Sequence, residues 1–409
     1  MRVLHTADLH LGQILYHNYD RVDEHSHFFG QLRQWCREFK PDALLLSGDI
    51  FDIPQPGAAT REMFNRTFAG IHRSFPEMRI VITAGNHDSA SRIEADSSVW
   101  DLSGVTLIGH APLPDIQGET PADHFIVEIP SQGFIIALPF MVSSRKEAVQ
   151  TILDRVAQRN TGSLPVVMMA HTAVVGSDFT GHGDIGTIKT SSLDEVGSGY
   201  DYLALGHIHR PQTIGQPLAN EFSERSEYPA PVARYSGSAL HVSCDEQYPH
   251  TVSLVDIDRH GGTVSLQRLV IDELRHFYIL PEADSPAPRS TDEVMKIIDD
   301  FCNSVQRGYF RLRIDRHTPV PPDFHQLIYQ RLEATGNEVR FNPNTIWEND
   351  DTKLAPEERP KFKIEELQQM AETPLDFVKR TIDSYPDLNL EELEEDFRLI
   401  EQEIRREQK

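Results

Sequence analysis

Five short polar clusters in the first half of the chain combine residue types that bind divalent cations. They are Asp8-Leu-His10, Gly48-Asp49, Gly85-Asn86-His87-Asp88, His171 and Gly206-His207-Ile-His209. In an extended segment, residues i and i+2 point to the same side, so the first and the last cluster can each direct two side chains at one ion. One such cluster commonly arises by chance, but five in succession indicate a metal site.

The donors in these clusters are oxygen and imidazole nitrogen, without cysteine thiolates. This set suits Mn²⁺, Fe²⁺, Zn²⁺ or Mg²⁺. It holds more donors than one ion with an open position needs, whereas two ions sharing a carboxylate would use it fully. Two cations roughly 3.5–4 Å apart would lower the pKa of a bridging water and could neutralise an anionic substrate. A histidine beside such a pair of ions could stabilise developing charge or donate a proton.

Short apolar runs precede these clusters and predict the strands that position them. We expect strands at Arg2–Thr6, Ala43–Leu46, Arg79–Thr83, Val166–Met169 and Tyr202–Leu205, each leading into a polar cluster, and a further strand at Phe134–Leu138. Apolar residues between Phe28 and Phe39 recur at helical spacing, and Pro41 ends that helix. In open α/β sheets the site lies beyond the carboxyl ends of the strands, so the clusters are expected to converge. The sequence predicts an α/β fold.

The chain divides by pattern into four parts. Residues 1–270 are predicted to form the domain that carries the clusters. Residues 271–343 are predicted to form a small α/β capping domain: Ser290 to Glu293 is a capping box that opens one helix, a second helix ends at Gly336, and strands are expected at Tyr309–Ile314 and Val339–Phe341. Residues 344–361 are predicted to be a linker, and residues 362–409 a helical hairpin.

The last predicted helix carries a narrow apolar stripe. Asn389 caps it, and its apolar residues alternate between spacings of three and four: Leu390, Leu393, Phe397, Ile400 and Ile404. This heptad seam is typical of a helix that packs on another helix or on a coiled coil. The hairpin could fold back on its own domain, but the preceding linker and the shortness of both helices favour a partner.

Composition excludes several classes of protein. The 409 residues carry 39 Lys and Arg against 63 Asp and Glu, a net charge of −24, which argues against holding nucleic acid by a basic surface alone. No apolar run reaches the ~20 residues of a membrane span, and the N-terminus does not resemble a signal peptide. The three cysteines form neither a disulfide framework nor a zinc pattern, so we expect buried thiols in a cytoplasmic protein.

In this order the five clusters resemble the motifs of the calcineurin-like metallophosphoesterase superfamily. Longer stretches resemble the SbcD family, the nuclease subunits of bacterial SbcCD complexes: Asp8-Leu-His-Leu-Gly12, Ser47-Gly-Asp-Ile-Phe-Asp52, Tyr200–His209 and Tyr235-Ser-Gly-Ser238. The resemblance implies a four-layer α/β/β/α metallophosphoesterase sandwich, followed by the capping domain and the C-terminal helical hairpin.

The same resemblance implies an activity and partners. It implies a metal-dependent DNA nuclease, a 3'-5' double-strand exonuclease and single-strand and hairpin endonuclease, with two divalent ions, Mn²⁺ before Mg²⁺. The C-terminal helices would bind an SMC-like ATPase of the SbcC type, because the chain has no phosphate-binding loop of its own. It further implies a homodimer within a heterotetramer, with Met63, Phe64, Phe68 and Ile71 as candidate contacts, acting at the nucleoid in DNA repair, recombination and replication.

The resemblance also assigns roles to single residues. It implies that Asp8, His10 and His209 hold one metal ion and that Asn86, His171 and His207 hold the other, while Asp49 bridges the two with its two carboxylate oxygens. His87 would act beside the scissile phosphate rather than as a ligand. Asp88 would orient His87, and Asp52 is a candidate for supporting the ligands.

Two other functions remain open from the sequence. A protein phosphatase or a small-molecule phosphodiesterase could use the same metal core, although phosphoprotein phosphatases carry Arg and Glu where this chain has Ile53 and Asp88. A structural subunit with a vestigial metal site is the other alternative, and the complete set of ligands argues against it.

Overall fold

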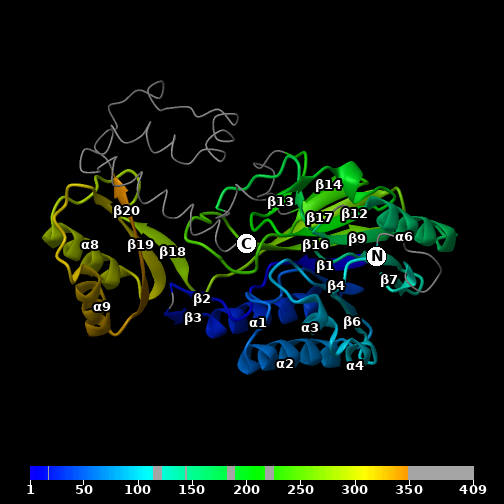
Figure 1. Cartoon of the computed structure of the whole chain (residues 1–409), viewed down its shortest axis with the longest axis horizontal. Helices are drawn as coiled ribbons and strands as arrows, with labels where there is room; N and C mark the ends of the chain where they lie inside the picture. The colour runs from blue at the N-terminus through cyan, green and yellow to red at the C-terminus, as the bar shows by residue number, and fades with distance from the viewer. Residues whose placement is uncertain (17, 114–121, 143–144, 182–188, 217–224, 349–409) are drawn as a thin grey trace, which may run out of the picture. The chain divides into compact units, whose positions relative to one another are not determined.

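The computed structural model describes residues 1–16, 18–113, 122–142, 145–181, 189–216 and 225–348. The chain divides into Met1–Glu348 and Asn349–Lys409, and all the described residues lie in the first part (Figure 1). The predicted hairpin over residues 362–409 and most of the predicted linker lie outside the described residues. No helix within the described ranges is long and apolar enough to cross a bilayer.

The first sheet has seven strands in the order β14-β17-β16-β1-β4-β5-β6. Its parallel half consists of β1 (Arg2–Thr6), β4 (Ala43–Ser47), β5 (Arg79–Thr83) and β6 (Val105–Ile108). Its antiparallel half consists of β16 (Thr251–Ile257), β17 (Thr263–Val270) and β14 (Arg225–Pro229). The three predicted strands of this sheet are confirmed, and β4 runs one residue further than predicted.

The second sheet has six strands in the order β13-β15-β12-β9-β8-β7. Parallel pairs join β15 (Val232–Tyr235), β12 (Tyr202–Gly206), β9 (Val166–His171) and β8 (Gly133–Ala137). Antiparallel pairs add β13 (Gln212–Thr213) and β7 (Ile126–Ile129) at its two edges. The structure therefore confirms an α/β fold with two mixed sheets.

Alternate residues of β1, β4 and β5 face opposite sides of the first sheet, as the two-residue period of a strand requires. One set joins the apolar core shared with the second sheet and with α6 (Lys146–Arg159): Val3, Leu45 and Val81. The other set packs against α1 (Val22–Phe39) and α2 (Ala58–Ser74): Leu4, Leu44 and Ile80. Figure 1 shows α1 and α2 on the same side of β1 and β4.

Three of the residues considered for a dimer contact belong to this core. Phe64, Phe68 and Ile71 lie on α2 with their side chains buried in this core, and Met63 is partly buried against the same cluster. The expectation that they form a subunit contact is wrong for the three buried residues, because their side chains are already covered by α1 and the sheet. Their helical spacing indicated an apolar face without showing what covers it.

A third apolar cluster holds together a smaller module. Its parallel sheet consists of β18 (His276–Leu280), β19 (Arg307–Asp315) and β20 (Glu338–Glu348), and its helices are α8 (Thr291–Ser304) and α9 (Phe324–Thr335). The Ser290 hydroxyl accepts a hydrogen bond from the Glu293 amide, as predicted. The Glu293 carboxylate accepts from the Arg289 amide rather than from that of Ser290, so the capping box is half formed.

The predicted linker begins too early: residues 344–348 belong to β20. β20 continues to Glu348, because after a register shift its last residues pair with the end of β19, with Asp315 opposite Glu348. The Arg313 guanidinium also pairs with the Glu348 carboxylate at 2.5 Å. Strand pairing with a neighbour thus outweighs the Pro-rich and charged composition that suggested a linker.

The remaining described elements are short. They are β2 (Ile14–Leu15), β3 (Tyr19–Asp20), α3 (Ala90–Glu94), α4 (Ser97–Asp101), β10 (Ala173–Val174), β11 (Thr190–Ser191) and α7 (Leu193–Val196). The cysteines Cys36, Cys244 and Cys302 are free and buried, as predicted.

The strand ends that carry the polar clusters meet where the two sheets touch. The Ser47 hydroxyl at the end of β4 donates a hydrogen bond to the Ala204 carbonyl of β12, 3.0 Å away. The Asp8 amide, just after β1, donates to the Gly48 carbonyl at 3.0 Å. The loops that follow these strands therefore face a common space.

Candidate metal centre

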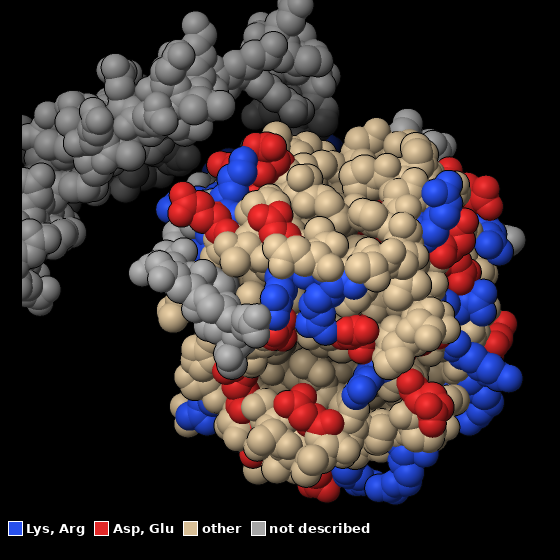
Figure 2. Space-filling model, turned by 90° about the vertical axis from the view of Figure 1, so that its right-hand side faces the viewer, with Lys and Arg blue, Asp and Glu red and all other residues tan. Residues whose placement is uncertain are grey.

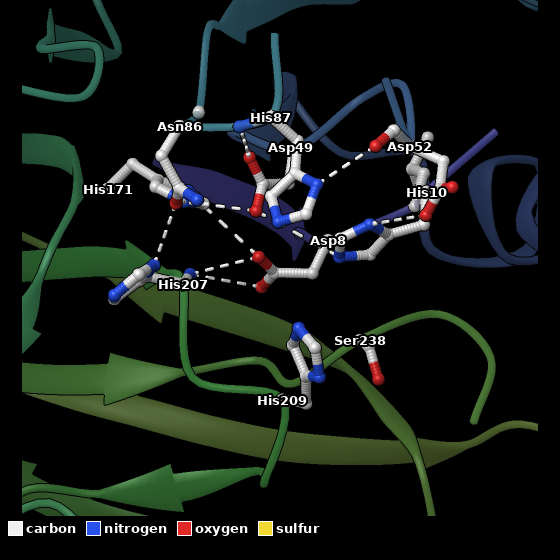
Figure 3. Close-up of polar contacts among 12 residues, drawn as sticks. Asp8, His10, Asp49, Asp52, Asn86, His87, His171, His207, His209 and Ser238 are labelled. Atoms are coloured by element: carbon white, nitrogen blue, oxygen red, sulfur yellow. Dashed lines mark hydrogen bonds and ion pairs between the residues drawn. The ribbon is translucent and has the colours of Figure 1, made fainter. Parts of the chain in front are cut away.

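The structure brings the seven predicted ligands together in two groups. Ligand atoms of Asp8, His10 and His209 lie within 4.8 Å of one another, and so do ligand atoms of Asp49, His171 and His207 (Figure 3). Asn86 joins the second group, because its Oδ1 atom lies 2.9 Å from His207 Nδ1 and 3.0 Å from His171 Nε2. These donors come from the loops after β1, β4, β5 and β12 and from the last residue of β9, His171.

Asp49 lies between the two groups. Its Oδ2 atom is 3.4 Å from His171 Nε2 in one group and 3.9 Å from His10 Nε2 in the other. Its Oδ1 atom accepts a hydrogen bond of 2.9 Å from the His87 amide. One oxygen thus faces histidines of both groups while the other is held by the backbone, and the expectation that both oxygens bridge the ions stays a prediction.

Four of the predicted ligands have a strained, left-handed backbone conformation. Asp8, His10, Asp49 and His207 have φ angles of 51°, 46°, 48° and 99°, in the left-handed region that residues other than glycine rarely adopt. Such backbone conformations cluster at functional sites, where the surrounding structure holds them in place. Four of the seven predicted ligands therefore project from turns that are costly to form.

The glycine before Asp49 and the glycine before Asn86 have a steric role. A Cβ on Gly48 would lie 2.1 Å from His171 Nδ1, and a Cβ on Gly85 would lie 2.1 Å from Asp49 Oδ1. Neither position accommodates a side chain while the ligand group stays assembled. The Gly-Asp and Gly-Asn pairs in the sequence thus reflect close packing of the loops.

Neighbouring groups fix the orientation of two imidazoles. The Nδ1 atom of His171 is 2.8 Å from the Ser47 carbonyl, and that of His209 is 2.8 Å from Glu246 Oε1. Such contacts orient a ring so that its opposite nitrogen can bind a metal ion. The Nδ1 atom of His10 lies 3.3 Å from Asp52 Oδ1 but makes no hydrogen bond to the described residues, so the supporting role of Asp52 stays a prediction.

Sequence reasoning missed Glu246. This residue is fully buried, and its carboxylate lies against His209 and accepts a hydrogen bond from the Val242 amide at 3.0 Å. Contact with His209 holds the pKa of Glu246 down, to about 2, although burial alone would raise it. The residue ends an unremarkable Ser-Cys-Asp-Glu stretch far from His209 in the chain, so no spacing could have revealed the contact.

The residues present fit a bound cation. His10 is buried, and its Nε2 atom has no hydrogen-bond partner among the described residues. An unsatisfied buried nitrogen is costly, and a metal ion beside Asp49 would satisfy it. The carboxylate, amide oxygen and imidazole donors form the set that divalent cations such as Mn²⁺, Zn²⁺ and Fe²⁺ accept.

His87 lies at the edge of these groups. Its Nδ1 atom is 2.9 Å from the backbone carbonyl of Asp52, which can only accept, so Nδ1 carries the hydrogen. Its ring centroid is 4.9 Å from that of His10, and ligand atoms of His10, Asp52 and His87 also lie within 4.8 Å of one another. His87 is therefore placed either to act on a substrate or to extend the ligand set.

The expectation that Asp88 orients the His87 ring is wrong. Both carboxylate oxygens of Asp88 accept hydrogen bonds from backbone amides, those of Ile50, Phe51 and Gly85, at 2.9–3.0 Å. Asp88 thereby joins the loop after β5 to the loop after β4, and the carbonyl of Asp52 contacts the ring instead. Burial and the nearby charge of Asp49 raise the pKa of Asp88 to about 6.

The charges of the buried groups are strongly linked. Burial raises the pKa of Asp8. Burial would also raise that of Asp49, but the imidazoles of His171 and His10 outweigh it and hold the pKa below its usual range. Burial would lower the pKa of His171, yet the carboxylates of Asp49 and Asp8 raise it to about 9. In the metal-free protein His171 is thus an imidazolium at neutral pH, donating to Ser47 and to the Asn86 oxygen.

Metal uptake should therefore release protons. The Nε2 proton of His171 must leave before that nitrogen can bind an ion, because its pKa is raised to about 9. We expect the apparent affinity for Mn²⁺ to increase about tenfold per pH unit for each proton released, between about pH 6 and pH 8. Calorimetric titration in buffers of different ionisation enthalpy counts the protons, and a pH-independent affinity without proton release would contradict the prediction.

Comparison with known proteins identifies the family to which the chain belongs. The pattern of the calcineurin-like phosphoesterases matches residues 1–211, just over half of the 409 residues, including all five polar clusters. The chain belongs to the calcineurin-like phosphoesterase family. Membership implies divalent metal ions, and the two ligand groups of this calcineurin-like phosphoesterase provide candidate positions for them.

The chain is also similar to nuclease subunits, as its motifs indicated. It is 30% identical to the SbcD subunit of the nuclease SbcCD from Rhodobacter capsulatus and 27% identical to that from Bacillus subtilis, over 63% of this chain in each case. It is 28% identical, over 52% of its length, to a DNA double-strand break repair protein of Aeropyrum pernix. The aligned regions span 66%, 66% and 49% of these relatives, less than two thirds of their lengths.

Proposed function

We propose that this phosphoesterase is the nuclease subunit of a complex of the SbcCD type. It would hydrolyse DNA phosphodiesters at a pair of divalent cations, Mn²⁺ before Mg²⁺, as a 3'-5' double-strand exonuclease and as an endonuclease on single strands and hairpins. The observation that carries this proposal is the position of Asp49, whose Oδ2 atom faces His171 of one ligand group and His10 of the other. A shared carboxylate is a hallmark of two-metal hydrolysis of phosphate esters.

The proposed reaction divides the work between the ions and the side chains. Bound cations would neutralise the phosphodiester and activate water for attack. Asp8, His10 and His209 would hold one ion, and Asn86, His171 and His207 the other, with Asp49 between them. The Nε2 atom of His87 would contact the scissile phosphate and transfer a proton to the leaving oxygen, while the Asp52 carbonyl keeps the ring turned toward it.

The surface charge supports a role for the cations in holding DNA. Figure 2 shows one face of the molecule, on which Lys and Arg side chains are interspersed with Asp and Glu rather than gathered in a broad basic area. The whole chain carries a net charge of −24. Because phosphate binding depends on positive charge, ions at the centre and a partner protein would have to supply much of it.

One assay separates this function from the alternatives. The purified chain is incubated with linear duplex DNA, a phosphopeptide and a cyclic nucleotide, with Mn²⁺ or with a chelator, and with or without an SbcC-type ATPase and ATP. We expect Mn²⁺-dependent release of nucleotides from DNA. Hydrolysis of the phosphopeptide or the cyclic nucleotide without cleavage of DNA would instead support a phosphatase, and no hydrolysis of any substrate would support a structural subunit.

The assembly is also part of the proposal. We propose that the chain folds as a four-layer sandwich with a capping domain over residues 271–343, and that it forms a homodimer within a heterotetramer with the ATPase. The complex would act on DNA ends during repair, recombination and replication, in the cytoplasm at the nucleoid. The two sheets with α1, α2 and α6 support the layered arrangement.

Deletion of residues 362–409 should abolish binding to the ATPase. The heptad seam from Leu390 to Ile404 is the segment proposed to pack on the coiled coil of the partner. The shortened chain should keep its Mn²⁺ binding and a cooperative thermal transition, because the described ligand groups lie within residues 1–348. Co-purification tests the binding, and aggregation of the shortened chain or retained binding would contradict the prediction.

A further inference from the structure

A further group of possible ligands is buried beside the proposed centre. Ligand atoms of His241, Glu246 and His250 lie within 4.8 Å of one another, and all three residues are buried. The ring centroids of the two histidines are 4.2 Å apart. None of the three belongs to the motifs that define the paired ligand groups.

The hydrogen bonds of His250 leave one of its nitrogens facing an acceptor. Its Nδ1 atom is 3.0 Å from the Ser238 hydroxyl and 2.9 Å from the Ser238 carbonyl, and because the carbonyl can only accept, the hydrogen resides on Nδ1. Its Nε2 atom lies 3.5 Å from Glu246 Oε2 and has no hydrogen-bond partner among the described residues. Burial and the neighbouring His241 lower the pKa of His250 to about 4, so Nε2 is unprotonated at neutral pH. Two lone pairs therefore face each other.

The hydrogen bonds of His241 likewise leave one ring nitrogen without a hydrogen-bond partner among the described residues. Its Nε2 atom is 2.7 Å from Glu273 Oε1 and donates its hydrogen to that carboxylate. Its Nδ1 atom is buried, again without a hydrogen-bond partner among the described residues. A histidine whose outer nitrogen donates to a carboxylate or a carbonyl, and whose inner nitrogen is unsatisfied, is in the tautomer that metal ligands adopt.

We infer that Nδ1 of His241, Nε2 of His250 and the carboxylate of Glu246 form a separate site for a divalent cation, best suited to Zn²⁺. Two imidazoles and a carboxylate are a common zinc-binding set, and a fourth position would be open to a solvent oxygen. A cation between the two facing lone pairs would satisfy nitrogens that make no hydrogen bond to the described residues. Glu273 and Ser238 are the supporting groups that hold the two rings in the required tautomers.

The site would connect two parts of the described structure. Glu246 uses its other oxygen, Oε1, to contact His209 of the paired centre. Glu273 also contacts His276 Nδ1 at 2.8 Å, at the start of β18, and the ring of His241 lies 5.0 Å from that of Phe277. A cation held here would therefore fasten the β18–β20 module to the loops that carry the paired ligands. This inference does not depend on the proposed nuclease activity.

Counting bound zinc tests the inference. The full-length chain is stripped with a chelator, incubated with Zn²⁺ alone, passed through a desalting column and analysed for metal. We expect His250→Gln and His241→Gln each to bind one ion fewer than the wild type. The matched control is His25→Gln, because His25 is also buried but both of its nitrogens contact carbonyls, those of Arg21 and Leu9, so its zinc count should stay at the wild-type value.

A second measurement separates this site from the paired centre. In an Asp49→Asn background, adding His250→Gln should still lower the zinc count by one ion and reduce the increase in Tm that Zn²⁺ produces. Equal zinc counts in the wild type and in both cluster variants would overturn the inference and leave a proton shared by His250 and Glu246. If both variants fail to fold, three ions per wild-type chain support the inference and two or fewer overturn it.

Discussion

Exchanging Asp49 for asparagine should lower Mn²⁺-dependent cleavage of DNA by about three orders of magnitude or more. A single oxygen of Asp49 faces His171 and His10, one from each ligand group. Asparagine keeps the shape but removes the charge that both ions would share. The ions are worth several kcal/mol of transition-state stabilisation, and each 1.4 kcal/mol corresponds to about a tenfold change in rate. Single-turnover cleavage of a labelled duplex measures the loss.

The matched control for this variant is Asp256→Asn. Asp256 is a partly exposed carboxylate that pairs with Arg2 at 2.7 Å, and no ligand group includes it. Its activity should remain near that of the wild type, and both variants should retain cooperative melting. Cleavage by Asp49→Asn at the wild-type rate would refute the bridging role of this carboxylate.

The second large effect is expected for His87→Gln. This variant should lose a factor of about 10²–10⁴ in kcat, the range for a group that transfers a proton in the transition state. Its Mn²⁺ stoichiometry should not change, because the two principal ligand groups do not include His87. Calorimetry counts the ions and a steady-state nuclease assay gives kcat.

The alternative role of His87 has a distinct signature. His87 also lies within 4.8 Å of His10 and Asp52, so it could be a ligand instead. Loss of one bound ion in the His87→Gln variant would show that His87 is a metal ligand. His110→Gln is a suitable control, since His110 is exposed and pairs with Glu94, and it should alter neither value.

The strands and the polar clusters could be predicted because both depend on local sequence. β1 and β5 begin and end at the predicted residues, Arg2–Thr6 and Arg79–Thr83, since short apolar runs followed by polar turns define a buried strand. Convergence of Asp8 with Asp49 could be predicted as well, because parallel strands end at the same edge of a sheet. The geometry of the site therefore follows largely from strand order.

The supporting contacts could not be predicted, because they depend on how loops pack. Asp88 follows His87 in the chain, which suggested a side-chain contact, but its carboxylate contacts the amides of Ile50, Phe51 and Gly85. Glu246 reaches His209 across 37 positions of sequence. The extension of β20 to Glu348 depends on pairing with β19, which the composition of residues 344–348 does not reveal.

The left-handed backbone at Asp8, His10, Asp49 and His207 has an evolutionary consequence. Each of these residues costs the folded protein about 1 kcal/mol that glycine at the same position would not. In a descendant freed from the need to bind ions, exchange to glycine would relieve this backbone strain, but it would also remove contacts such as the hydrogen bond from the His87 amide to Asp49. Loss of Asp49 would in addition leave the buried imidazole of His171 without its carboxylate partner. The strained turns therefore persist only while such contacts offset their cost.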